Sequence, residues 1–101
     1  MDFSGKAAVV TGASGGLGRE IAVALGAAGA RVGLVARSQQ GLEETRRLIG
    51  QPGTQVLCTD LRDEKAIEKL GESVKTGFGA VDILVNAAGV WHDERTRRQR
   101  R

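Results

Sequence analysis

The chain has 101 residues, of which 41% are apolar and 27% charged, a composition typical of a single folded domain and not of a disordered segment. No run approaches the ~20 apolar residues of a membrane span, and the first residues lack the basic-then-apolar pattern of a secretory signal. Five of the 15 basic residues fall in the last seven positions, so the net charge of +3 comes from the end of the chain and the rest is mildly acidic.

Four apolar runs alternate with three helical patterns along the chain. In order, we predict a strand at 6–11, a helix at 16–28, a strand at 31–36, a helix at 39–49, a strand at 54–59, a helix capped by Asp63 and ending near Phe78, and a strand at 81–86. The residues expected to face the core are Leu17, Ile21, Leu25 and Ala28 in the first helix, Leu42, Leu48 and Ile49 in the second, and Ala66, Ile67, Leu70, Val74 and Phe78 in the third.

This alternation predicts an α/β fold, half of a Rossmann doubly wound parallel sheet with the order β-α-β-α-β-α-β. Right-handed crossovers give the strand order 3-2-1-4, with the third helix on the opposite face from the first two. We expect residues 1–90 to form this half-domain and residues 91–101 to be a disordered, arginine-rich tail.

A glycine-rich segment joins the first strand to the first helix. It reads T-G-x-x-x-G-x-G, where Gly12 permits the turn, Gly16 the approach of a pyrophosphate, and Gly18 the close packing of helix on strand. Ser14 and the backbone N–H groups of Gly15, Gly16 and Leu17 are the expected phosphate donors. The alternative is a tight turn that binds no ligand.

Together, Thr11–Gly18, Asp60-Leu61 and the run D-I-L-V-N-A-A-G at 82–89 resemble the N-terminal half of the short-chain dehydrogenase/reductase family. The resemblance covers residues 5–90. It implies that Asp60 bonds the adenine amino group, that Leu61 packs nearby, and that Asn86 and the residues after it line the adenosine and stabilise the sheet. Asp60 as a plain loop residue is the alternative.

The end of the second predicted strand indicates the cofactor. An acid there would accept hydrogen bonds from the ribose of NAD, but no acid occurs between Arg31 and Gln40. Arg37 offers a guanidinium to a 2′-phosphate instead, so NADP is favoured over NAD. The family often adds a second basic residue in the glycine loop, where this chain has Gly15. An Arg37 that only contacts solvent is the alternative.

Hydride transfer in this family uses a Tyr-x-x-x-Lys pair and an upstream serine, and the chain has no tyrosine. We therefore expect a truncated member that binds the dinucleotide and has no catalytic residue. The alternatives are a non-catalytic nucleotide-binding or subunit-interaction module and an inert, frameshifted fragment.

Three further expectations concern single residues and surfaces. One cysteine, Cys58, is typical of a cytoplasmic protein, is expected to be buried, and with the lone His92 cannot form a metal site. The arginine-rich tail lacks interleaved aromatic residues, which argues against nucleic-acid binding. The last strand is expected to leave an exposed sheet edge that favours self-association.

Overall fold

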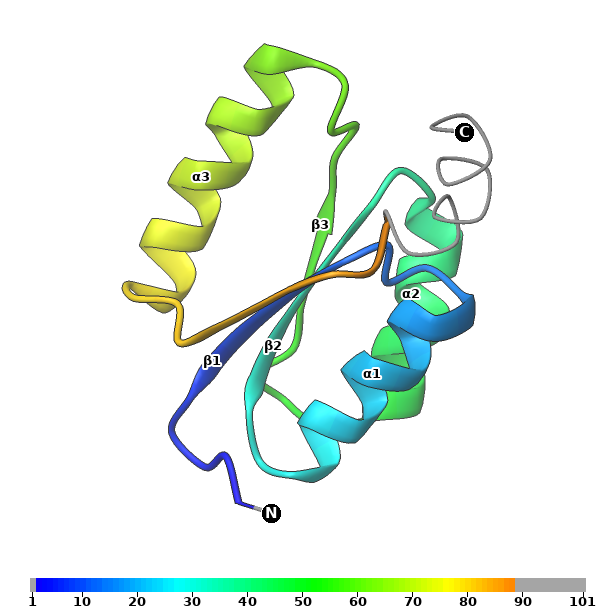
Figure 1. The fold of residues 1–101 in the computed structure, drawn as a ribbon, viewed down its shortest axis with the longest axis vertical. Helices are drawn as coiled ribbons and strands as arrows, with labels where there is room; N and C mark the ends of the chain where they lie inside the picture. Colours follow the sequence, from blue (N-terminus) through cyan, green and yellow to red (C-terminus); the bar gives the residue numbers. More distant parts are fainter. Residues whose placement is uncertain (1, 89–101) are drawn as a thin grey trace, which may run out of the picture.

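The computed structural model describes residues 2–88, which form a four-stranded parallel sheet with helices on both faces (Figure 1). The strand order is β3-β2-β1-β4, so the predicted fold and strand order are confirmed. The elements are β1 (Ala7–Thr11), α1 (Gly16–Ala27), β2 (Arg31–Ala36), α2 (Gln39–Ile49), β3 (Gln55–Cys58), α3 (Glu64–Phe78) and β4 (Ile83–Asn86). The predicted tail at 91–101, with His92, lies outside the described residues, so the boundary at residue 90 stays a prediction.

The sheet separates two apolar cores. Side chains alternate along a strand, so Ala8 and Val10 of β1 face α1 and α2, whereas Ala7 and Val9 face α3. Figure 1 shows α3 on one side of the sheet and the other two helices on the opposite side, as predicted. Because both faces of β1 and β2 are covered, these strands read as continuous apolar runs.

The predicted inward faces of α1 and α2 are partly wrong. Leu17 is 47% exposed and Leu48 55% exposed, while the buried positions are Gly18, Ala22 and Gly26 in α1 and Leu42 and Thr45 in α2. The reason is close packing: a Cβ on Gly26 would lie 2.6 Å from Ile49 Cγ2, so small residues must face the neighbouring helix.

The predicted inward face of α3 agrees with the structure except at Ile67. Phe78 is buried and Ala66, Leu70 and Val74 are half-buried, but Ile67 is 44% exposed. Asp63 caps the helix as predicted, its carboxylate accepting from the N–H of Lys65 at 3.0 Å. No helix within residues 2–88 is both long and apolar enough to cross a membrane.

Candidate functional site

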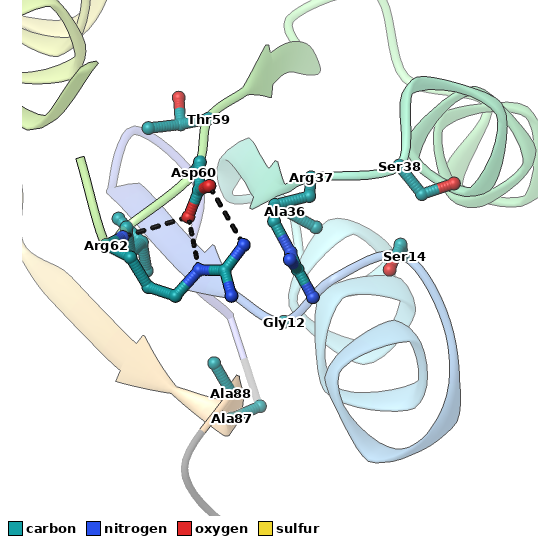
Figure 2. A pocket seen from close by; sticks show the side chains of 11 residues that line it. Gly12, Ser14, Ala36, Arg37, Ser38, Thr59, Asp60, Arg62, Ala87 and Ala88 are labelled. Carbon is teal, nitrogen blue, oxygen red and sulfur yellow. Dashed lines mark hydrogen bonds and ion pairs between the residues drawn. The ribbon is translucent and has the colours of Figure 1, made fainter.

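A cavity of about 420 Å³ opens where the strands end at their carboxyl side (Figure 2). It is lined by segments that follow all four strands: Gly12, Ser14, Ala36, Arg37, Ser38, Thr59, Asp60, Leu61, Arg62, Ala87 and Ala88. In a doubly wound sheet, ligands bind at this edge, at the point where the crossover connections change from one face of the sheet to the other. The cavity therefore brings Gly12 and Ser14 of the predicted glycine loop together with Arg37, Asp60 and Leu61. The predicted donors Gly15, Gly16 and Leu17, and also Gly18, are not among its lining residues.

The glycine loop, residues 11–18, is held tightly by its own backbone and by the segment after β4. A Cβ on Gly12 would lie 2.7 Å from the N atom of Ala88, and a Cβ on Gly18 would lie 2.0 Å from the O atom of Gly12. Gly16 has φ +54°, a conformation that side chains disfavour. Three of the predicted glycines are thus required by the protein itself.

The N-terminus of α1 differs from those of the other two helices in residues 2–88. Ser38 caps α2 and Asp63 caps α3, but no side chain caps α1. The first turn of α1, like that of α2, carries no acid. The N–H groups of Gly16 and Leu17 reach no backbone acceptor among the described residues. Free N–H groups at the positive end of a helix dipole form a site for an anion.

Gly15 provides a test of whether a phosphate group fits this loop. Its φ of 175° is ordinary extended backbone, and nothing lies within 4 Å of the position that a Cβ would take. The protein itself does not require glycine at this position. The space beside the Gly15 backbone is therefore open, and a phosphate fits there.

Arg37 follows β2 and its side chain extends from the end of that strand toward the glycine loop (Figure 2). The residue is exposed, and no ion pair within the described part of the chain involves it. Its backbone O atom accepts a hydrogen bond from Cys58 Sγ at 3.1 Å. The prediction that Cys58 is buried is wrong: it ends β3, an edge strand, and is exposed.

Asp60 lies in the cavity, but its carboxylate already has a partner. Arg62 donates from Nε at 3.1 Å, from Nη2 at 3.2 Å and from its backbone N–H at 3.0 Å (Figure 2). These bonds, from the side chain first and then the backbone, lower the pKa of Asp60 from 3.8 to about 2. The carboxylate is therefore held ionised and turned toward Arg62.

Asn86 ends β4 but does not line the cavity. Its Oδ1 accepts a hydrogen bond of 2.7 Å from the hydroxyl of Thr11, the residue paired with it across β1 and β4. Asn86 thereby joins the ends of the two strands that flank the glycine loop. Of the residues after it, Ala87 and Ala88 line the cavity, and Gly89 lies outside the described residues.

The cavity is also lined by Ser38, Thr59 and Arg62, for which no role was predicted from the sequence. Arg62 could have been found from its place two residues after Asp60, since such a short separation allows the pair to form in a turn. Ala87 and Ala88 contribute backbone and small surface, for which a sequence gives no chemical signal. Residues 2–88 hold no group of three His, Cys, Asp or Glu arranged for a metal.

Comparison with known proteins agrees with this geometry. The 3-oxoacyl-(acyl-carrier-protein) reductase of Escherichia coli is 44% identical over 93 residues, which cover 92% of this chain and 38% of that protein. The structure of glucose dehydrogenase from Caenorhabditis elegans matches with a TM-score of 0.80 and 33% identity, covering 85% of this chain and 38% of that one. A metagenomic short-chain oxidoreductase in complex with NADP matches with a TM-score of 0.75 and 41% identity, covering 80% and 38%.

This chain thus spans a little over a third of the length of these relatives. The family described as short chain dehydrogenase matches residues 6–100, almost the whole sequence. The resemblance inferred from the glycine loop, from Asp60-Leu61 and from the run that ends β4 is therefore confirmed. The chain belongs to the short-chain dehydrogenase family.

Proposed function

We propose that this chain binds NADP(H) in the cavity at the carboxyl ends of the strands. The observation that carries the proposal is the uncapped N-terminus of α1, which opens beside a cavity that also holds the Arg37 side chain. A ligand with phosphates at two separate positions matches this arrangement. The NADP-bound relative supports the assignment of the cofactor class.

The glycine loop would hold the pyrophosphate. The N–H groups of Gly15, Gly16 and Leu17 and the hydroxyl of Ser14 are the donors, and Gly12 and Gly18 keep the loop close to the sheet. Because the first turn of α1 has no acid, no carboxylate opposes the bound charge.

Arg37 would hold the 2′-phosphate, which distinguishes NADP from NAD. Ala36 occupies the end of β2, where an acid would repel that phosphate, and Arg37 follows with its guanidinium in the cavity. Asp60 and Leu61 would form the adenine side of the pocket. Since Arg62 engages both carboxylate oxygens of Asp60, an adenine amino group would share this acceptor with Arg62.

When bound, the nicotinamide supplies the hydride chemistry of the family. The proton donor that the family resemblance implies is a tyrosine, and the sequence has none. We therefore propose that the chain as given holds the dinucleotide without reducing a carbonyl compound.

Fluorescence titration of the 101-residue chain with NADPH and with NADH tests the binding. We expect saturable NADPH binding and a weaker response to NADH. Arg37→Ala is expected to weaken NADPH binding about tenfold, because it removes a charge-assisted hydrogen bond in a partly solvated site, and to leave NADH unaffected.

Arg47→Ala is the matched control, since Arg47 is an exposed arginine of α2 paired with Glu44 and lies outside the cavity. Absence of NADPH binding by the unsubstituted chain would refute the proposal. Oxidation of NADPH in the presence of an aldehyde or ketone would refute the second part, that the chain is catalytically incomplete.

We also propose self-association through β4. Within residues 2–88 this strand pairs only with β1, and Leu84, which the register places on the α3 face of the sheet with Val9, is 71% exposed. A second β4 would satisfy the free N–H and C=O groups of that edge and place its own apolar side chains beside Leu84. Sedimentation analysis should detect dimers that Leu84→Lys abolishes; a monomer at all concentrations would contradict this.

A further inference from the structure

Arg19, on the first turns of α1, makes a set of contacts that the proposed function does not use. Its side chain is half-buried and donates to three different oxygens. Nη2 reaches the backbone O of Ser14 at 2.7 Å and that of Gly41 at 3.1 Å, and Nε reaches Thr45 Oγ1 at 2.9 Å. No carboxylate within the described chain pairs with it. A guanidinium placed on backbone carbonyls is suited to holding segments in place, since its donors form a rigid fork.

Thr45 extends this network into the glycine loop. The residue is fully buried, and its hydroxyl lies 2.6 Å from the backbone O of Ala13 and 3.2 Å from that of Gly41. The hydroxyl has one proton to donate, which the shorter distance assigns to Ala13, and it accepts from Arg19. Arg19 therefore controls two successive carbonyls of the loop, that of Ser14 directly and that of Ala13 through Thr45.

Holding these carbonyls also orients the donors that a phosphate would use. A peptide group is planar and trans, so the direction of one C=O fixes that of the next N–H. The Ser14 carbonyl determines the direction of the Gly15 N–H, which is one of the proposed donors. The Ala13 carbonyl fixes the peptide group that precedes Ser14, the residue whose hydroxyl is another proposed donor.

The same network holds the loop against the start of α2. A Cβ on Gly41 would lie 2.7 Å from the O atom of Ser14, so the two segments touch through their backbones. Gly41 is three residues after Ser38, the cap of α2, which in turn follows Arg37. Arg19 thus links the two places where the proposed ligand carries its phosphates.

We propose that Arg19 is a positioning residue that sets the spacing between the glycine loop and Arg37, and so determines the affinity for a ligand that contacts both. This inference rests on the proposed function. It implies that Arg19 matters for NADPH, which bridges the two segments, and not for 2′-AMP, which has the 2′-phosphate and adenine but no pyrophosphate.

The test compares Arg19→Ala, Arg19→Lys and the control Arg47→Ala in the full chain. Arg19→Ala is expected to weaken NADPH binding about tenfold, because the glycine loop loses the charge-assisted hydrogen bonds that hold it in place. Binding of 2′-AMP is expected to change less than twofold. Arg19→Lys keeps the charge but cannot contact all three oxygens together, so we expect NADPH binding still several-fold weaker than in the unsubstituted chain.

Amide hydrogen exchange gives a readout without any ligand. Two amides report on the network: the N–H of Ala13 donates to the O atom of Val35, and the N–H of Gly41 donates to Ser38 Oγ. Both amides should exchange faster in the two Arg19 variants and at an unchanged rate in Arg47→Ala. Circular dichroism verifies that each variant is folded; if Arg19→Ala is not, Arg19→Lys decides.

The possible failures are distinct. If the unsubstituted chain binds no NADPH, the proposed function is refuted, together with the ligand part of this inference. If the unsubstituted chain does bind NADPH, two results overturn the inference. Full NADPH affinity in Arg19→Lys would show that the charge of Arg19 matters and not its positioning role. An equal loss of NADPH and 2′-AMP affinity in Arg19→Ala would show that the spacing between the two segments is irrelevant. Unchanged amide exchange overturns it whatever the ligand result.

Discussion

Two glycines of the same loop are expected to respond differently to substitution by alanine. Gly18 is needed by the protein, because a Cβ there would lie 2.0 Å from the O atom and 2.6 Å from the C atom of Gly12. Both are backbone atoms, so the loop would have to move about 1.4 Å to reach the 3.4 Å of an ordinary contact. Overpacking of this kind costs ~1–3 kcal/mol, which lowers the Tm of a domain of this size by ~4–24 °C.

Gly15 has neither constraint, since its backbone is extended and a Cβ would meet nothing within 4 Å. Alanine there restricts the unfolded chain, which stabilises by ~0.4–1 kcal/mol, but it is a poorer N-cap residue than glycine, an effect of similar size and opposite sign. We therefore expect the Tm of Gly15→Ala to change by less than ~4 °C. Alanine keeps the backbone N–H of this residue, and the family resemblance allows a basic side chain at this position, so a Cβ is compatible with the dinucleotide. NADPH binding by Gly15→Ala is therefore expected to change by less than about threefold.

The assay is thermal unfolding followed by circular dichroism, paired with NADPH titration of each variant. Binding of 2′-AMP serves as the control, because that ligand has no pyrophosphate and should bind Gly15→Ala normally. A tenfold loss of NADPH affinity in Gly15→Ala at an unchanged Tm would contradict the expectation that this position tolerates a side chain. A Gly18→Ala variant with the original Tm would refute the packing argument itself.

Three further predictions follow from single contacts. The pKa of Asp60 is lowered to about 2, so its pairing with Arg62 stabilises the fold above pH ~4, and this stabilisation is lost as the pH falls through 2. Asp60→Asn should therefore flatten the dependence of Tm on pH between about pH 4 and pH 2. An unaltered pH dependence would contradict the pairing. Asp63→Ala removes the cap of α3 and should cost ~1 kcal/mol, measured as a shifted urea midpoint with the same m value. Leu34→Ala empties a fully buried site and should cost ~2–5 kcal/mol by the same measurement, whereas a loss below 1 kcal/mol would show that the core can close around the gap.

The candidate site was predictable where its chemistry depends on short segments. The glycine loop lies within eight residues, Arg37 directly follows β2, and Asp60 is the second residue after β3, so the parallel topology alone brings them to one edge of the sheet. Asn86 was assigned to the same edge, but its side chain bonds Thr11 and does not line the cavity. That distinction depends on the direction of a side chain, which a sequence pattern does not specify.

The helix faces were less predictable because they depend on how closely the helices approach. Leu17 continues an apolar repeat and yet is exposed, since glycines at 18 and 26 allow α1 to pack with its small side inward. Cys58 reads as a buried strand residue and yet is exposed, because β3 is an edge strand and Cys58 is its last residue. Apolar periodicity reports that a residue can be buried, and the neighbouring element decides whether it is.

The sequence by itself determined the order of strands and helices, the parallel pairing and the position of the glycine loop at the switch point of the sheet. These follow from local periodicity and from the handedness of crossovers, which need no knowledge of distances. The contacts by which Arg19 and Thr45 hold the glycine loop against α2 became apparent only from the tertiary structure. Those contacts depend on ångström-scale separations between segments up to 32 residues apart, which packing alone sets.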